Sequence, residues 1–419
     1  MPIDVLGTLD PRALGRELKA ARIRCRMTQE QAARLIGVAR TTLVAIEQGD
    51  RRLKPEELVA LAHGYGRQVG EFVRQRPRVD AFEPQFRGPA DPSDDDRARI
   101  APAVSLFEDL CRSYLELEEL TSSPLVRRYP QEYRVAGLPV EQAAESVAAE
   151  ERNRLRLGDG PIPMIRDVLE QDVGLRVFLL DMPPRYAEIY VYTDQLGGCL
   201  AGNRLHPEER RRWSLSHGYA HFLVHRRQGV VSAEGTYQRR PEHERFADAF
   251  ARFFLMPTAG LVRRFNDVRQ SKGKVTPVDL YTLSQYFGVS MEALMHRAED
   301  LRLVQPGRWE EFRRSGSKVG DLRARAGLEP RAERADRYPL RYRYLALEAF
   351  DLGLLTEGQL GAFLDVSRVE GRLLVEEAHQ GRVEPEDRFA PQLEAGMKEP
   401  AVGAAHEEGP HAEEQSVPS

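Results

Sequence analysis

Two histidines four residues apart are the clearest chemical feature of the sequence. His217 and His221 lie in RRRWSLSHGYAHFLVH, a segment whose pattern predicts a helix that begins just after Pro207. A spacing of four residues places both imidazoles on one face of a helix. One zinc ion can bind both rings, because imidazole nitrogens are common zinc ligands. The spacing therefore predicts a metal site, with a simple pair of hydrogen-bonded histidines as the alternative.

Hydrolysis at such a site needs a group that takes a proton from metal-bound water. In the motif H-E-x-x-H, the glutamate after the first histidine is this general base. Gly218 stands at that position here. The base contributes about 10²–10⁴-fold to the rate, and glycine costs a helix about 1 kcal/mol relative to alanine. We therefore predict no catalytic residue here. The position is not filled by any of the nearby polar residues Tyr219, His225, His243 and Asp248.

A second helix that starts with proline, PEHERFADAFARFFLMP, offers a third ligand. Glu244 lies near its beginning, and its carboxylate is a suitable donor for zinc beside two imidazoles. The small side chains of Ala247 and Ala251 allow this helix to approach the first one closely. The two helices together predict a site with two histidines and one glutamate.

These motifs resemble the ImmA/IrrE metallopeptidase family, in which H-E-x-x-H precedes a helix E-x-x-A-[ND]-x-F-A that ends in L-M-P. The likeness runs from AAEERNRLRL to about Val304. It implies a zincin-like α+β domain and a zinc ion held by His217, His221 and Glu244. It also implies a peptide or protein partner in the cleft, added as a strand to the sheet edge. Members of the family commonly cleave a helix-turn-helix repressor in stress or mobile-element responses.

The N-terminal segment TQEQAARLIGVARTTLVAIEQGDRR has the pattern of two helices joined by a tight turn. Thr28 and Gln31 form a capping-box pattern at the start of the first helix. Gly37 permits the positive φ that the turn needs. Leu43 and Ile46 anchor the second helix to the core.

The start of that second helix carries the residues that we expect to contact DNA. Arg40, Thr41 and Thr42 project from its first turn, where a recognition helix meets base edges in the major groove. Arg40 is suited to guanine and Gln29 to a backbone phosphate. From 12 to 54, eleven basic residues face four acidic ones, a local charge of +7, which favours a phosphate-binding surface.

Residues 12–70 resemble the Xre/Cro helix-turn-helix family, which implies a double-stranded DNA operator. A homodimer is expected, because one recognition helix covers only a half-site. Ala39 departs from the family, which often has a serine cap there, and this substitution forfeits about 1 kcal/mol. A three-helix interaction module is the alternative.

Two further segments share this pattern. Residues 356–366 repeat the spacing of residues 28–38, and residues 283–297 share the Gly-Val step of the turn. We expect helix-turn-helix geometry in both, without the basic surroundings of a DNA reader. For the C-terminal copy we predict a packing or dimerisation role, with a second DNA contact through Arg368 as the alternative, which is weakened because Asp365 replaces the turn glycine.

The composition fits a globular protein of several domains. The chain has 419 residues, of which 41% are hydrophobic and 30% charged, with a net charge of −4. Three β-like runs, 175–181, 187–194 and 197–203, predict a short sheet within a mostly α fold. Without a long apolar run or an apolar leader, a cytoplasmic protein is expected. Cys25, Cys111 and Cys199 lie too far apart in sequence to suggest a disulfide framework.

These observations predict the following organisation: a helix-turn-helix domain over 1–76, a linker over 77–103, the metallopeptidase-like domain over 104–304, a linker over 305–336, a helical helix-turn-helix-like module over 337–390 and a disordered acidic tail over 391–419. The resulting hypothesis is a DNA-binding transcriptional regulator whose degenerate metallopeptidase-like domain senses a signal or binds a partner. One alternative is a zinc-dependent endopeptidase that cleaves a repressor or itself. Another is an antitoxin or phage-defence component that makes only protein contacts.

Overall fold

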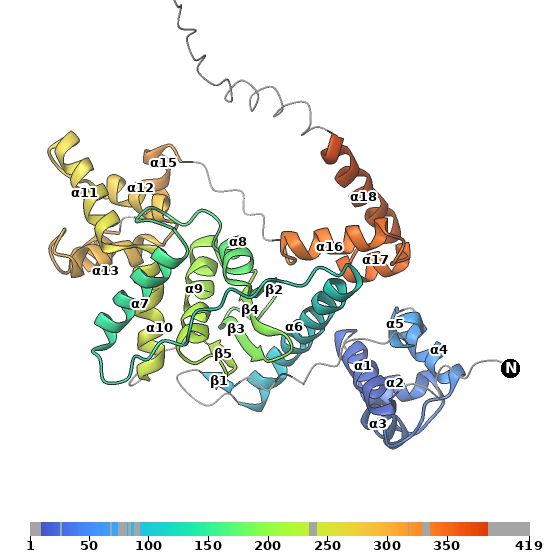
Figure 1. The fold of residues 1–419 in the computed structure, drawn as a ribbon. Helices are drawn as coiled ribbons and strands as arrows, with labels where there is room; N and C mark the ends of the chain where they lie inside the picture. The colour runs from blue at the N-terminus through green and yellow to red at the C-terminus, as the bar shows by residue number, and fades with distance from the viewer. Residues whose placement is uncertain are drawn as a thin grey trace, which may run out of the picture.

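The fold is mostly helical, with one small mixed sheet at its centre, as the sequence predicted (Figure 1). The computed structural model describes residues 10–25, 27–67, 69–73, 82, 85–87, 93–233, 241–316, 318–328 and 336–383. The predicted acidic tail lies outside the described residues. Among the described helices, none combines the length and apolar character that crossing a membrane requires.

The N-terminal unit contains five helices: α1 (Pro11–Arg24), α2 (Gln29–Leu35), α3 (Arg40–Gln48), α4 (Pro55–Gly64) and α5 (Val69–Val73). The capping box of Thr28 and Gln31 is present at the start of α2. Gly37 takes a φ of 65° in the turn between α2 and α3, a conformation that costs glycine little. Ala39 begins α3 without a side-chain cap, as its methyl group dictates.

The sheet has five strands: β1 (Gln85–Arg87), β2 (Arg176–Leu180), β3 (Tyr186–Thr193), β4 (Gly197–Asn203) and β5 (Val230–Ala233). Their order is β1-β5-β3-β4-β2, with β3 antiparallel to both of its neighbours and the two outer pairs parallel. The three predicted strands are present. Sequence analysis missed β1 and β5, because three or four residues are too few to show a period of two.

Helices cover both faces of this sheet. One face packs against α7 (Val140–Arg154), α9 (Glu208–Val224) and α10 (Glu242–Leu255), and the other packs against α6 (Asp94–Leu120) and α16 (Leu340–Asp351). Alternation along β3 places Tyr190 in the first core and Ile189 in the second. The α9 face carries the predicted metal ligands.

Helix α6 begins inside the range predicted as a linker. Ser93 and Asp96 form a capping box at its N-terminus, so the predicted linker of 77–103 is wrong from residue 94 onward, where a helix begins. Figure 1 shows α6 between the N-terminal helices and the sheet. Arg112 of α6 pairs with Glu17 of α1 at 2.6 Å, and this contact joins the two parts of the chain.

A group of short elements completes the central and C-terminal parts: α8 (Ile165–Asp167), the π-helix η2 (Val168–Val173), α11 (Thr258–Lys272), α12 (Pro277–Phe287), α13 (Met291–Asp300), α14 (Arg308–Arg314), α15 (Val319–Ala326), α17 (Glu357–Leu364) and α18 (Arg368–Val383). Helices α14 and α15 lie in the second predicted linker and bury Trp309 and Leu322 in the core of the α9 face. Those two apolar residues were too sparse to predict a packed segment.

Both additional helix-turn-helix patterns form the expected turn. Gly288 between α12 and α13 has a φ of 65°, and Asp365 between α17 and α18 has a φ of 54°. Aspartate is among the few residues other than glycine that adopt this conformation readily. Helices α16 and α17 bury Tyr342 and Phe363 in the core shared with α6, which is the packing role expected of this module.

Candidate metal centre and DNA-binding surface

The three predicted metal ligands lie together between α9 and α10. The Nε2 atoms of His217 and His221 are 3.1 Å apart. One carboxylate oxygen of Glu244 lies 3.4 Å from His217 Nε2, and the other lies 3.5 Å from His221 Nε2. All three residues are buried. The close approach of α10 has the cause inferred from sequence, since Ala247 and Ala251 are both completely buried.

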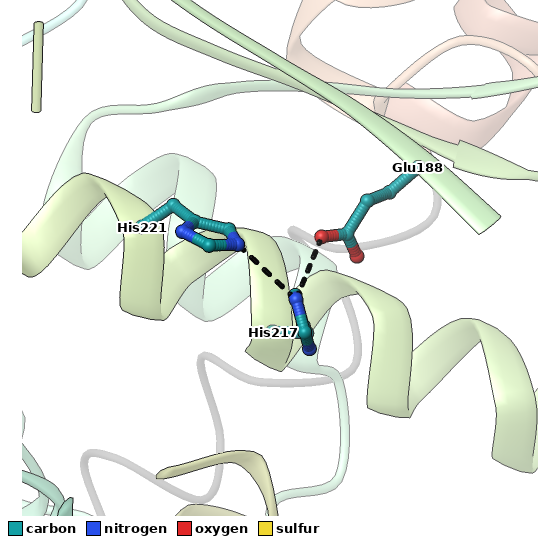
Figure 2. Close-up of side chains that lie close together, drawn as sticks. All are labelled: Glu188, His217 and His221. Carbon is teal, nitrogen blue, oxygen red and sulfur yellow. Dashed lines mark hydrogen bonds and ion pairs between the residues drawn. The ribbon is translucent and has the colours of Figure 1, made fainter. Parts of the chain in front are cut away.

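Glu188 of β3 is a fourth member of this cluster that sequence analysis missed. Its Oε1 atom lies 3.8 Å from His217 Nε2, and its side chain is 1% exposed. Figure 2 shows its carboxylate pointing from the strand toward the histidines of α9. The available signal was its position two residues before Tyr190, because alternate residues of a strand share one face.

A carboxylate behind the first histidine fixes the orientation of its ring. His217 Nδ1 lies 3.2 Å from Asp248 Oδ1, and such a contact leaves Nε2 to face the other donors. His243, which was expected outside the ligand set, has its Nε2 atom 3.5 Å from Glu244 Oε1 and a side chain that is 32% exposed. Asp248 and His243 therefore contact the predicted ligands His217 and Glu244 from outside the ligand set.

The cluster is electrostatically suited to a cation. Burial raises the pKa of Glu188 to about 8, opposed by His217 and reinforced by the charge of Glu244. Burial lowers the pKa of His217, but Glu188 and Asp248 outweigh this effect and hold that pKa well above its usual range. Three carboxyl groups thus lie near the histidines, and a bound divalent ion would favour the ionised form of Glu188 and the neutral imidazole of His217.

Gly218 has a packing role that the sequence did not reveal. A Cβ atom at this position would lie 2.3 Å from Cδ1 of Leu200, a completely buried residue of β4. Helix α9 therefore packs directly on the sheet at this glycine. The side chain of Leu200 occupies the space that the first atoms of a glutamate would need.

The sheet edge near the cluster is already paired. Strand β5, which holds Ser232 beside Glu188, pairs on its other side with β1. A peptide strand would therefore not add at β5, because β1 already uses the backbone groups that it would need. The edge strands of the sheet are β1 and β2, and the expected addition of a peptide strand at a sheet edge stays a prediction.

A cleft next to the cluster remains open to a partner or ligand. It has a volume of about 1050 Å³ and reaches Glu188, His217 and Glu244. Aromatic side chains from α9, α12 and α14 line the rest of it, namely Trp213, Tyr281 and Trp309. This mixture of apolar walls and a few polar groups is typical of binding sites.

The predicted DNA contacts lie at the start of α3. Arg40 and Thr41 are exposed, whereas Thr42 and Gln29 are half-buried. Gln29 Oε1 accepts hydrogen bonds of 3.4 Å from Nε and Nη2 of Arg40, and Gln29 Nε2 donates to Glu47 at 3.1 Å. Sequence analysis missed this link from Arg40 through Gln29 to the interior.

Comparison with known families agrees with both regions. Residues 13–74 match the model of a helix-turn-helix domain, and residues 170–299 match that of the IrrE N-terminal-like domain. The second range contains Glu188, His217, Gly218, His221 and Glu244. No curated protein matches the chain significantly. One chain thus contains a segment similar to a helix-turn-helix domain and a later segment similar to an IrrE N-terminal-like domain.

Proposed function

We propose that this protein is a DNA-binding transcriptional regulator whose degenerate metallopeptidase-like domain senses a signal or binds a partner. The observation that carries the proposal is the helix-turn-helix domain at residues 13–74, with Arg40 exposed at the start of its second turn-forming helix. That position faces base edges when such a helix lies in the major groove. Two copies would read the two half-sites of a pseudo-palindromic operator.

Within the metallopeptidase-like domain, His217, His221 and Glu244 would hold a zinc ion. The residues fit the ion, because they are buried donors from two helices whose nitrogen and oxygen atoms converge. A bound zinc ion supplies Lewis acidity and lowers the pKa of a coordinated water. Asp248 orients His217 for binding.

Peptide cleavage is disfavoured by the same domain. Gly218 provides no proton acceptor, and Leu200 fills the adjacent space. The pairing of β1 with β5 also occupies the side of β5 at which a peptide strand would lie next to the cluster. The cleft of about 1050 Å³ beside the cluster would then serve recognition, with a peptide or protein segment as the partner.

Replacing Arg40 by alanine tests the DNA-binding role. The change should weaken binding to a selected operator by about 1–3 kcal/mol, because it removes a guanidinium that contacts a base. Fluorescence anisotropy at fixed salt concentration, with a DNA site selected from a random pool, measures the effect. Arg308→Ala, in an exposed part of α14, is the matched control. Equal affinity of the Arg40 variant and the wild type would contradict the assignment of α3.

A further inference from the structure

We propose that Glu188 is a fourth protein ligand of the metal ion and closes the site to water and substrate. The proposal rests on the metal site of the proposed function and extends it, because it decides what the ion does. Structural zinc sites have four protein ligands, whereas catalytic sites have three and keep one position open. With Glu188 bound, the site belongs to the first class.

The distances between donor atoms fit a tetrahedral ion. Bonds of about 2.0–2.1 Å to nitrogen and oxygen require donor atoms about 3.3–3.4 Å apart at the corners of a tetrahedron. In the structure, the two histidine Nε2 atoms are 3.1 Å apart and His217 Nε2 lies 3.8 Å from Glu188 Oε1. Glu244 places one oxygen 3.4 Å from His217 Nε2 and its other oxygen 3.5 Å from His221 Nε2. These four values bracket the required distance. The distance of 3.8 Å from His217 to Glu188 is the longest of them, so a shift of a few tenths of an ångström, on the order of the difference from the required distance, would make Glu188 the fourth ligand.

The bonding of Glu188 is incomplete without a cation. Its Oε1 atom accepts a hydrogen bond of 3.3 Å from Ser232. Its Oε2 atom is buried and has no hydrogen-bond partner among the described residues. A buried carboxylate oxygen without a partner is costly. Coordination of an ion would satisfy this carboxylate within the cluster that already contains the histidines.

Glu188 and Gly218 would both act against hydrolysis at the metal site. Gly218 removes the group that would activate a water, and Glu188 occupies the position at which that water would bind. A side chain at position 218 would meet Leu200, so restoring the glutamate would require Leu200 to move. With a glycine at position 218 and Glu188 bound to the ion, the site would hold a metal ion without hydrolysing a peptide. The ion would then have a structural or regulatory role.

The experiment compares full-length wild type with Glu188→Gln and Glu188→Ala. Glu170→Gln is the matched control, because Glu170 is also a buried glutamate but accepts a hydrogen bond from Tyr114 instead. Zinc content is measured by elemental analysis and zinc affinity by competition with a chromophoric chelator. Cobalt(II) replaces zinc for visible absorption spectra, recorded with and without azide as a small anionic ligand.

The wild type and the Glu170 variant should bind one zinc ion per chain and give the intense cobalt absorption of a four-coordinate site, unchanged by azide. Both Glu188 variants should bind zinc at least about 10-fold more weakly, and azide should alter their cobalt spectra. Unchanged affinity and spectra in both Glu188 variants would overturn the proposal. An azide-sensitive wild type would do so as well.

Absence of zinc in the wild type would overturn the proposed metal site together with its fourth ligand. Operator binding by the same samples distinguishes this result from failure of the regulator hypothesis. A wild type that lacks zinc but binds the operator retains the DNA-binding function. A wild type that binds zinc but no DNA retains the metal site and contradicts the DNA-binding function.

Discussion

Replacing Glu47 by alanine should destabilise the helix-turn-helix domain by about 3–5 kcal/mol, the cost of breaking a buried ion pair. The side chain of Glu47 is 2% exposed and that of Arg22 is 10% exposed. Both oxygens of Glu47 accept from Arg22, Oε1 from Nε at 2.6 Å and Oε2 from Nη2 at 3.0 Å. Because a guanidinium does not lose its proton in proteins, the variant leaves a buried charge without its partner.

Hydrogen exchange of the full chain, read by mass spectrometry over α1 to α3, measures this loss locally. Glu57→Ala is the matched control, because Glu57 pairs with Arg51, whose side chain is 30% exposed, and water can solvate the remaining charge. The double variant Arg22→Met/Glu47→Leu should recover much of the protection, since apolar pairs often replace buried ion pairs without loss. Equal loss of protection in Glu47→Ala and Glu57→Ala would contradict the argument.

The same variant should also release Arg40, the residue proposed to contact a DNA base. Glu47 accepts a hydrogen bond from Gln29, which in turn contacts Arg40. Without the carboxylate, Gln29 loses the contact that positions its amide beside the guanidinium. Operator affinity should therefore fall in Glu47→Ala even where enough of the domain remains folded to bind DNA.

Sequence analysis succeeded where the signal was local. The spacing of His217 and His221 follows from the helical period, and the small residues at 247 and 251 indicated the approach of the helix that carries Glu244. The turn residue Gly37 is likewise a local signal, because glycine adopts a positive φ at little cost. These features need no knowledge of distant contacts.

The missed features depend on contacts between distant segments. Glu188 joins the site because β3 lies against α9, and a single glutamate in a strand does not show which face is covered. Strand β1 forms only by pairing with β5, far along the chain. The start of α6 is a different case, because the run Ser93 to Asp96 combines the acidic composition of a linker with the capping box of a helix, and composition alone does not distinguish the two.

Introducing glutamate at position 218 should destabilise the central domain and should not create a peptidase. A side chain at this position meets Leu200 within 2.3 Å at its first atom. Overpacking of this kind costs about 1–3 kcal/mol, and the buried carboxylate adds to that cost. Gly320→Glu is the matched control, because Gly320 is exposed in α15 and its Cβ would meet no described atom within 4 Å.

A double-mutant cycle with Leu200→Ala tests this explanation. The alanine variant alone should cost about 2–5 kcal/mol, because it leaves a cavity in the core. In the double variant the new glutamate occupies that cavity. The loss of stability in the double variant should therefore be smaller, by about 0.5–3 kcal/mol, than the sum of the losses in the two single variants. Urea denaturation followed by tryptophan fluorescence reports on this domain, since the chain has two tryptophans and both pack in the core that contains Leu200.

The same variants, loaded with zinc, are also tested for peptide hydrolysis. Only the double variant has room for a carboxylate beside the histidines, and in it Glu188 still occupies the proposed fourth position. Peptide hydrolysis should therefore require Glu188→Ala in addition to that pair, because a general base acts only on a bound water. Strict additivity of the two stability losses would contradict the contact between Gly218 and Leu200. Hydrolysis by Gly218→Glu alone would show that neither Leu200 nor Glu188 blocks the reaction.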